Sequence, residues 1–126
     1  MKAEARAESF LCDDAEVVLI ACNTPARTAK GAVQDLRNMG IKAGLFRPIT
    51  LWPFPVEDLK KAIHGAQRIV VVEASAGQLE DEVRLALSKA GVRQFPEIES
   101  VRRMGGVLPQ QNEIMTRVLS PKEVLA

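Results

Sequence analysis

Two short, uninterrupted apolar runs restrict the fold of this chain more than any other feature of its sequence. They are VVLIAC at residues 17–22 and IVVV at residues 69–72. Both are far shorter than the ~20 apolar residues that a membrane helix needs. Runs of this length, rich in β-branched side chains, are typical of strands buried on both faces in the middle of a parallel sheet. Because parallel strands must be joined by a crossover, the sequence predicts helices between them.

The rest of the pattern supplies those helices and further strands. We expect strands at residues 16–22, 41–47, 68–73 and 95–101, and a short edge strand at residues 9–12. We expect helices at residues 25–39, 56–63, 78–90 and 113–119. The first helix would have Thr24 as its N-cap and Pro25 as its first residue, with Gly40 in the left-handed position after its last turn. The third would bury Leu79, Val83, Ala86, Leu87 and Ala90. This alternation predicts an α/β fold built on a parallel sheet.

Length and charge fit one soluble domain. The chain has 126 residues, 47% of them hydrophobic, which is enough to build a core. Its 17 basic and 16 acidic side chains nearly cancel, so we expect no nucleic-acid partner. No apolar signal segment follows Met1 and no run can span a membrane, so we expect a cytoplasmic protein. We assign residues 1–14 to an N-terminal tail or linker that includes the edge strand, and residues 15–126 to the domain.

Common catalytic and cofactor-binding motifs are absent from the sequence. It contains no G-x-G-x-x-G, no phosphate-binding G-x-x-x-x-G-K-[ST] and no nucleophile motif G-x-S-x-G. Cys12 and Cys22 are its only cysteines and His64 is its only histidine, too few to ligate an iron–sulfur cluster. Paired acids such as Glu57 and Asp58 lie where a helix should begin, and there the helix dipole favours them. We therefore predict no catalytic residue, no metal site and no bound cofactor.

Two candidate anion sites follow from the expected fold, because open α/β sheets bind ligands beyond the carboxyl ends of their strands. Asn23, Thr24 and Arg27 begin the first helix and would present amides and a guanidinium to an anion. Arg103 belongs to an Arg-Arg-Met-Gly-Gly turn that could cradle a phosphate. The simpler interpretation, which we favour for both groups, is that Thr24 only caps the helix and that Arg27 and Arg103 are solvated.

A second set of candidates would contact a partner chain. Trp52 and Phe54 lie on a segment with three prolines in eight residues, and aromatic side chains on a stiff loop are common interface anchors. The alternative is that they cover the edge of the chain's own sheet. Arg47 lies just before this segment and joins the set. Glu73 ends a strand close to Gln78, and its carboxylate either holds the next helix or meets a partner chain.

Four segments resemble the alpha subunits of 2-oxoacid:ferredoxin oxidoreductases. Residues 23–33 (NTPARTAKGAV) are similar to the turn and helix after that family's first strand. Residues 44–55 contain RPITLWPFP, the most specific match of the four. Residues 71–78 (VVEASAGQ) and 105–109 (GGVLP) are similar to a later strand and to the closing turn. The resemblance covers about residues 15–119 and falls on the C-terminal, transketolase-type part of the subunit, domain II.

The resemblance implies both a fold and an activity. The fold would be a three-layer α/β/α sandwich with a mostly parallel five-stranded sheet and one antiparallel edge strand. The whole enzyme would oxidatively decarboxylate a 2-oxoacid, transfer the acyl group to coenzyme A and reduce ferredoxin. Its cofactors would be thiamine diphosphate with magnesium and an iron–sulfur cluster. An N-terminal domain and the beta subunit build the thiamine diphosphate site in that family. Because that domain is not in this sequence, we expect either a fragment of a longer subunit, which we favour, or a separately encoded domain.

Within such an enzyme, the resemblance implies a non-catalytic domain for subunit assembly, with the rest of the alpha subunit and the beta subunit as partners. The alternative is a small module that binds an anion or coenzyme A near Asn23, Thr24 and Arg103. The sequence departs from the family at Cys22 and Asn23, which replace a small or aromatic residue and a glycine. This departure argues against a close backbone approach to a ligand at that turn. Neither the 2-oxoacid nor the oligomeric state follows from the sequence.

Overall fold

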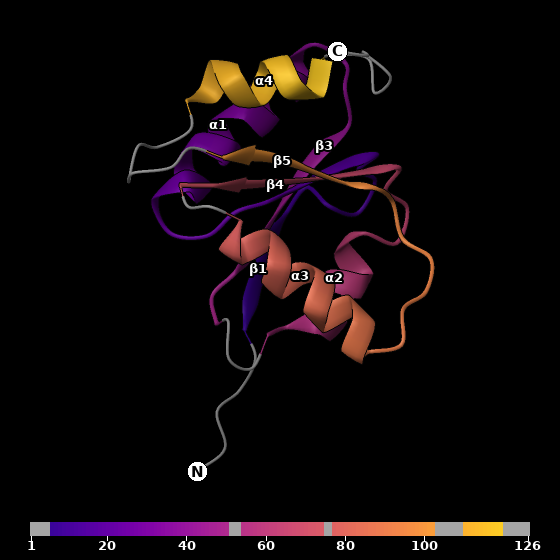
Figure 1. Cartoon of the computed structure of the whole chain (residues 1–126). Helices are drawn as coiled ribbons and strands as arrows, with labels where there is room; N and C mark the ends of the chain where they lie inside the picture. Colours follow the sequence, from indigo (N-terminus) through magenta and orange to yellow (C-terminus); the bar gives the residue numbers. More distant parts are fainter. Residues whose placement is uncertain (1–5, 51–53, 75–76, 103–109, 120–126) are drawn as a thin grey trace, which may run out of the picture.

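A five-stranded sheet lies between two layers of helices (Figure 1). The computed structural model describes residues 6–50, 54–74, 77–102 and 110–119. In chain order the elements are β1 (Ala7–Phe10), β2 (Val17–Ile20), α1 (Thr24–Asn38), β3 (Ala43–Pro48), α2 (Val56–Ala62), β4 (Arg68–Glu73), α3 (Gln78–Lys89), β5 (Ile98–Arg102) and α4 (Gln111–Leu119). Helices α1 and α4 cover one face of the sheet, and α2 and α3 cover the other. This arrangement confirms the three-layer α/β/α fold.

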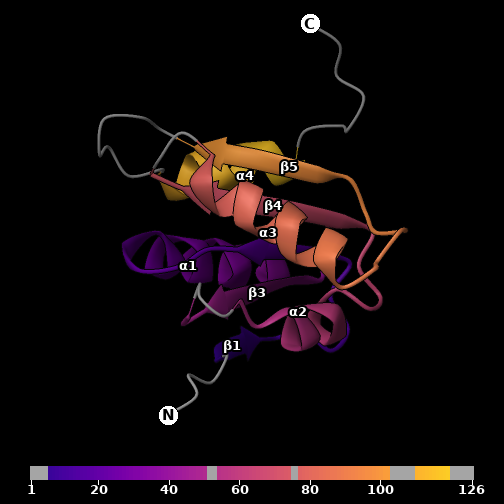
Figure 2. The ribbon, with the colours of Figure 1, turned by 60° about the horizontal axis from the view of Figure 1, so that its bottom comes forward.

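The sheet is mixed, with strand order β1-β3-β2-β4-β5. Strands β2 to β5 run parallel, whereas β1 pairs antiparallel with β3, placing Ala7 opposite Pro48. Figure 2 shows β1 and β5 at the two opposite edges. The edge strand starts at Ala7, earlier than the predicted residues 9–12. It does so because the backbone of Arg6 is already held, its N–H donating to Oγ1 of Thr50 at 2.9 Å.

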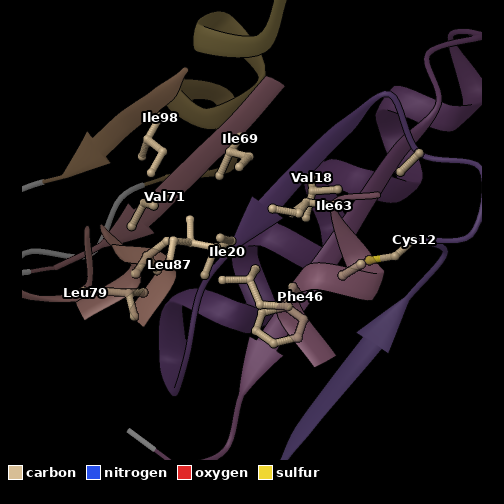
Figure 3. Close-up of a cluster of buried hydrophobic side chains, with 14 residues drawn as sticks. Cys12, Val18, Ile20, Phe46, Ile63, Ile69, Val71, Leu79, Leu87 and Ile98 are labelled. Atoms are coloured by element: carbon tan, nitrogen blue, oxygen red, sulfur yellow. The ribbon is translucent and has the colours of Figure 1, made fainter. Parts of the chain in front are cut away.

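Alternate side chains of the central strands face two separate cores. In β2, Val18 and Ile20 point toward α2 and α3, where they meet Phe46 of β3 (Figure 3). The neighbouring Val17 and Leu19 point toward α1 and α4. Burial on both faces explains why β2 is one apolar run rather than an alternating one. Each large side chain buried in these cores contributes about 1.5–3 kcal/mol.

Several helix ends differ from the prediction by one or two residues. Helix α1 begins at Thr24, so Asn23 occupies the cap position and the proline is the second helical residue; the assignment of Thr24 as N-cap was wrong. The Asn23 backbone has φ 58° and ψ −138°, a conformation that glycine adopts most easily. Gly40 follows α1 with φ 88°, as predicted. Ala90, predicted to be buried, is exposed because α3 ends at Lys89, and Ala90 lies beyond its buried stripe.

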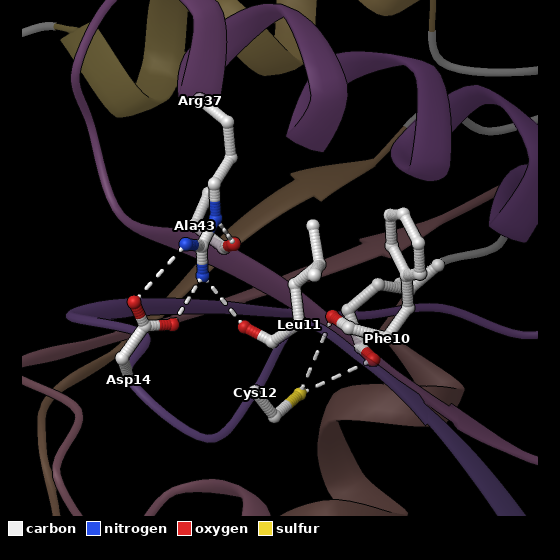
Figure 4. Close-up of polar contacts among 7 residues, drawn as sticks. Phe10, Leu11, Cys12, Asp14, Arg37 and Ala43 are labelled. Atoms are coloured by element: carbon white, nitrogen blue, oxygen red, sulfur yellow. Dashed lines mark hydrogen bonds and ion pairs between the residues drawn. The ribbon is translucent and has the colours of Figure 1, made fainter.

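Arg37, near the end of α1, fixes the connection between β1 and β2 (Figure 4). Its guanidinium donates to both carboxylate oxygens of Asp14, at 2.7 and 3.2 Å. It also donates to the carbonyl oxygens of Leu11 at 2.7 Å and Ala43 at 2.8 Å. The hydrogen bonds from Arg37 hold the pKa of Asp14 below its usual range. Beside this connection, a Cβ on Gly44 would stand 2.8 Å from the Leu11 carbonyl oxygen, so a side chain does not fit there.

Arg68 attaches α4 to the sheet. It donates to the carbonyl oxygens of Val118 at 2.7 Å and Arg117 at 3.2 Å, in the last turn of α4. It also binds both carboxylate oxygens of Glu99 in β5, each at 2.8 Å. These contacts lie near the amino ends of β4 and β5, so they are far from a site at the carboxyl ends. No helix in the described ranges is long and apolar enough to cross a lipid bilayer.

Candidate functional site

The carboxyl ends of β2, β3 and β4 meet at one end of the sheet. Strand β2 leads into α1 on one face, whereas its neighbour β4 leads into α3 on the other face. Where helices leave adjacent strands in opposite directions, a crevice opens, and open α/β sheets bind ligands in that crevice. The side chains at this position are Cys22, which follows β2, and Glu73, which ends β4.

Glu73 occupies the crevice as a helix cap. The residue is only 4% exposed. Its Oε1 accepts the backbone N–H of Leu79 at 2.8 Å, and its Oε2 accepts that of Glu80 at 3.2 Å. Gly77, the residue before α3, has φ 106° and offers no capping side chain. Of the two roles considered for Glu73, the structure therefore shows that its carboxylate holds the next helix. A contact between Glu73 and a partner chain stays a prediction.

Cys22 is a half-buried free thiol. Burial raises the pKa of the Cys22 thiol, and the negative charge of Glu73 raises it further. The positive charge of Arg47 acts in the opposite direction, but the net effect is a raised pKa. The nucleophile of a cysteine is its thiolate, so a raised pKa makes Cys22 a weak nucleophile at neutral pH. The crevice therefore contains no activated catalytic group among the residues described.

A cleft opens beside the crevice, between α1 and the paired strands β1 and β3. It has a volume of about 390 Å³ and is lined by Glu8, Ser9, Phe10, Asn23, Ala26, Arg27, Lys30, Leu45 and Arg47. Arg47 Nη1 pairs with Glu8 Oε1 across the two strands at 2.8 Å. The ammonium of Lys30 lies 4.8 Å from the centre of the Phe10 ring. Three cations and one carboxylate therefore surround a partly apolar floor. We call this feature the basic cleft.

The basic cleft brings together part of the predicted anion site. Asn23 and Arg27 both line it. The side chain of Thr24 and all of Arg103 lie outside the part of the chain that the structure describes. The cleft also contains Lys30, which the sequence reasoning missed. Its position three residues after Arg27, on the same side of a helix, was the signal that could have identified it.

The described part of the predicted interface set lies around the same end of the sheet and consists of Arg47, Phe54, Glu73 and Gln78. Arg47 is 45% exposed, and Gln78 is an exposed residue at the start of α3. Phe54 is half-buried and packs against the core under α2 and α3. Phe54 therefore packs on its own chain, and whether this segment covers the sheet edge or contacts a partner stays a prediction. Trp52 lies outside the described residues.

Metal-binding clusters are lacking in residues 6–50, 54–74, 77–102 and 110–119. No three His, Cys, Asp or Glu side chains there lie close enough to hold an ion. Cys12 is a buried free thiol whose Sγ donates to the Leu45 carbonyl oxygen at 3.3 Å (Figure 4), and burial raises its pKa. The described residues therefore include no ligand set for an iron–sulfur cluster.

Comparison with known proteins places the chain in a family. Residues 15–114 match the family described as pyruvate:ferredoxin oxidoreductase core domain II. The chain belongs to this family. One curated relative of this core domain II chain is the ketoisovalerate oxidoreductase subunit VorB of Methanothermobacter thermautotrophicus. The two are 39% identical over 115 residues, which cover 91% of this chain and 31% of VorB. Another is the 2-oxoglutarate synthase subunit KorA of Methanocaldococcus jannaschii, 39% identical over 106 residues, or 84% of the chain and 27% of KorA. The chain thus spans less than a third of either relative.

Solved structures show the same fold. A 2-oxoglutarate:ferredoxin oxidoreductase from Magnetococcus marinus, with 2-oxoglutarate, coenzyme A and succinyl-CoA bound, has a TM-score of 0.74 and 24% identity. That match covers 93% of this chain and 19% of the other. A split-gene transketolase, an inactive beta4 tetramer, has a TM-score of 0.72 and 18% identity, covering 90% of this chain and 40% of the other. These likenesses confirm the transketolase-type fold implied by the sequence resemblance.

Proposed function

We propose that the chain is a non-catalytic assembly domain in the alpha subunit of a 2-oxoacid:ferredoxin oxidoreductase. The observation that carries this proposal is its membership of the core domain II family, whose relatives named above are subunits of oxidoreductases. The site geometry agrees with it. The carboxylate at the ligand crevice is engaged in capping α3, and the neighbouring thiol is not activated. The domain would hold subunits together and help to position an active site built elsewhere.

The whole enzyme would convert a 2-oxoacid and coenzyme A to an acyl-CoA, releasing carbon dioxide and reducing ferredoxin in the cytoplasm. Its thiamine diphosphate, magnesium and iron–sulfur cluster would be held by other parts of the enzyme. The described residues of this chain offer no cluster of ligands for the metals. The partners of the domain would be the rest of the alpha subunit and the beta subunit, with neither nucleic acid nor a membrane involved.

The contact surface would lie at the carboxyl end of the sheet and include Arg47, Trp52, Phe54, Glu73 and Gln78. Arg47 is the best placed of the described members for an electrostatic contact. Its present partner, Glu8, is 62% exposed. An exposed ion pair of this kind contributes only about 0–1 kcal/mol, so a carboxylate on another subunit can replace Glu8 at little cost.

Co-purification tests the assembly role. The chain is expressed with the other subunits of the enzyme, and recovery of the complex is measured together with 2-oxoacid-dependent reduction of ferredoxin. Arg47→Glu should lower both, because it places a carboxylate where a partner expects a cation. Lys60→Glu on α2 is the matched control, since Lys60 is 42% exposed and also pairs with a glutamate, Glu57, at 3.5 Å. Equal recovery with the two variants, or turnover by the isolated chain, would contradict the proposal.

A further inference from the structure

The basic cleft carries positive charge that the ion pairs among the described residues do not fully neutralise. Arg47 is paired with Glu8. Neither Arg27 nor Lys30 forms an ion pair within the described ranges. Lys30 lies over the Phe10 ring, a contact that attracts an ammonium without cancelling its charge. Arg27 and Lys30 on α1 therefore face Arg47 on β3, and Glu8 is the one carboxylate among the residues that line the cleft.

The spacing of these cations suits an anion with more than one charged group. Arg27 and Lys30 are three residues apart on α1, so their side chains leave the same face of the helix. Arg47 approaches from β3 on the opposite side. Arginine side chains bind phosphate oxygens with two parallel N–H donors, and lysine contributes a point charge. The first turn of α1 contains no acidic residue that would compete with such an anion.

The cleft also has room and an apolar floor. Its volume of about 390 Å³ lies within the range of roughly 300–1,000 Å³ typical of small-molecule sites. Phe10, Ala26 and Leu45 supply apolar surface beneath the cations. A purely inorganic anion would leave this surface unused, whereas a ligand with a planar ring would cover it. The volume suits a small molecule better than a folded partner.

We propose that the basic cleft binds a small molecule that carries a diphosphate and a planar ring, the chemistry shared by nucleoside diphosphates and nucleotide-containing coenzymes. The diphosphate contacts Arg27, Lys30 and Arg47, and the ligand's ring takes the place of the Lys30 ammonium over Phe10. Arg47 is shared with the proposed contact surface, whereas Arg27 and Lys30 are not among the proposed contact residues. Variants at Arg27 and Lys30 therefore test ligand binding without changing the surface proposed for assembly.

Calorimetric titration of the 126-residue chain at low salt tests the proposal, with ADP, inorganic pyrophosphate and adenosine as probes. ADP should bind saturably and more tightly than either of the other two, because only ADP offers both the charge and the ring. A comparison of ADP with coenzyme A identifies the source of the diphosphate: tighter binding of coenzyme A indicates the coenzyme, and equal binding indicates the nucleotide part alone.

Matched variants distinguish binding at the basic cleft from nonspecific electrostatic attraction of the anion to the protein. Arg27→Gln and Lys30→Gln should each weaken ADP binding about tenfold, as expected for the loss of a hydrogen bond from a charged group. Lys61→Gln, an exposed cation on α2 outside the cleft, should change it less than about twofold. Circular dichroism checks that each variant is folded. Absence of saturable ADP binding, or equal weakening by Lys30→Gln and Lys61→Gln, overturns the proposal.

Discussion

Replacing Glu73, which ends β4 and caps α3, should destabilise the domain far more than replacing a glutamate of α3 itself. Glu73 is 4% exposed and receives two backbone N–H donors from the first turn of α3, at 2.8 and 3.2 Å. A hydrogen bond to a charged group is worth about 1.5–3 kcal/mol. Glu73→Ala removes both acceptors where water has little access, so we expect a loss of about 3–5 kcal/mol in the free energy of unfolding. Glu73→Gln keeps one carbonyl acceptor and should lose about 1.5–3 kcal/mol.

Urea denaturation followed by circular dichroism measures this effect. The midpoint should fall while the slope m stays constant, since the surface exposed on unfolding is the same. Glu82→Ala is the control, because Glu82 is on α3 but takes no part in the cap. Amide hydrogen exchange at Leu79 and Glu80 localises the change, and both amides should lose protection in Glu73→Ala. If Glu73→Ala and Glu82→Ala lower the free energy of unfolding by amounts within about 0.5 kcal/mol of each other, the capping argument is refuted.

Two further predictions concern a close contact and the crevice thiol. Gly44→Ala should lower the free energy of unfolding by about 1–3 kcal/mol, because its Cβ would stand 2.8 Å from the Leu11 carbonyl oxygen. In the control Gly65→Ala, the added Cβ would have no neighbouring atom within 4 Å, so the free energy of unfolding should change by less than about 0.5 kcal/mol. Equal effects of the two variants in urea denaturation would count against the close contact at Gly44. Cys22 should alkylate slowly with iodoacetamide at neutral pH, and Glu73→Gln should shift its rate–pH profile to lower pH by removing the negative charge that raises the thiol pKa. An unshifted profile would contradict this electrostatic coupling.

The strands that are buried on both faces could be predicted closely from the sequence. Strand β4 occupies residues 68–73 as predicted, because a run of β-branched residues leaves no alternative to a central strand. The predicted position of β1 was two residues too far along the chain. Its sequence, AESF, contains no apolar run, and the strand is defined by its pairing with β3. The end of α1 was marked by Gly40, whose φ of 88° suits glycine. The predicted start of α1 was one residue too late, because Asn23 adopts a positive φ that the local sequence pattern does not reveal.

The candidate site was predicted only in part. Asn23 and Arg27 could be found because both belong to one helix start. Glu8 could not, because it enters the basic cleft through pairing with β3, and the antiparallel register at Arg47 is not encoded locally. For Glu73, the sequence left two roles open. The choice depended on where the amides of Leu79 and Glu80 lie in space, six and seven residues along the chain.

The antiparallel strand β1 also bears on self-association. Without it, the outer row of N–H and C=O groups of β3 would be unpaired, and such a row is a template for strand addition by another molecule. Strand β1 covers that row with only four residues, which present a charged Glu8 rather than a long apolar surface. Short, charged outer strands are poor templates for aggregation. Strand β1 therefore protects this edge of the sheet from pairing with another molecule.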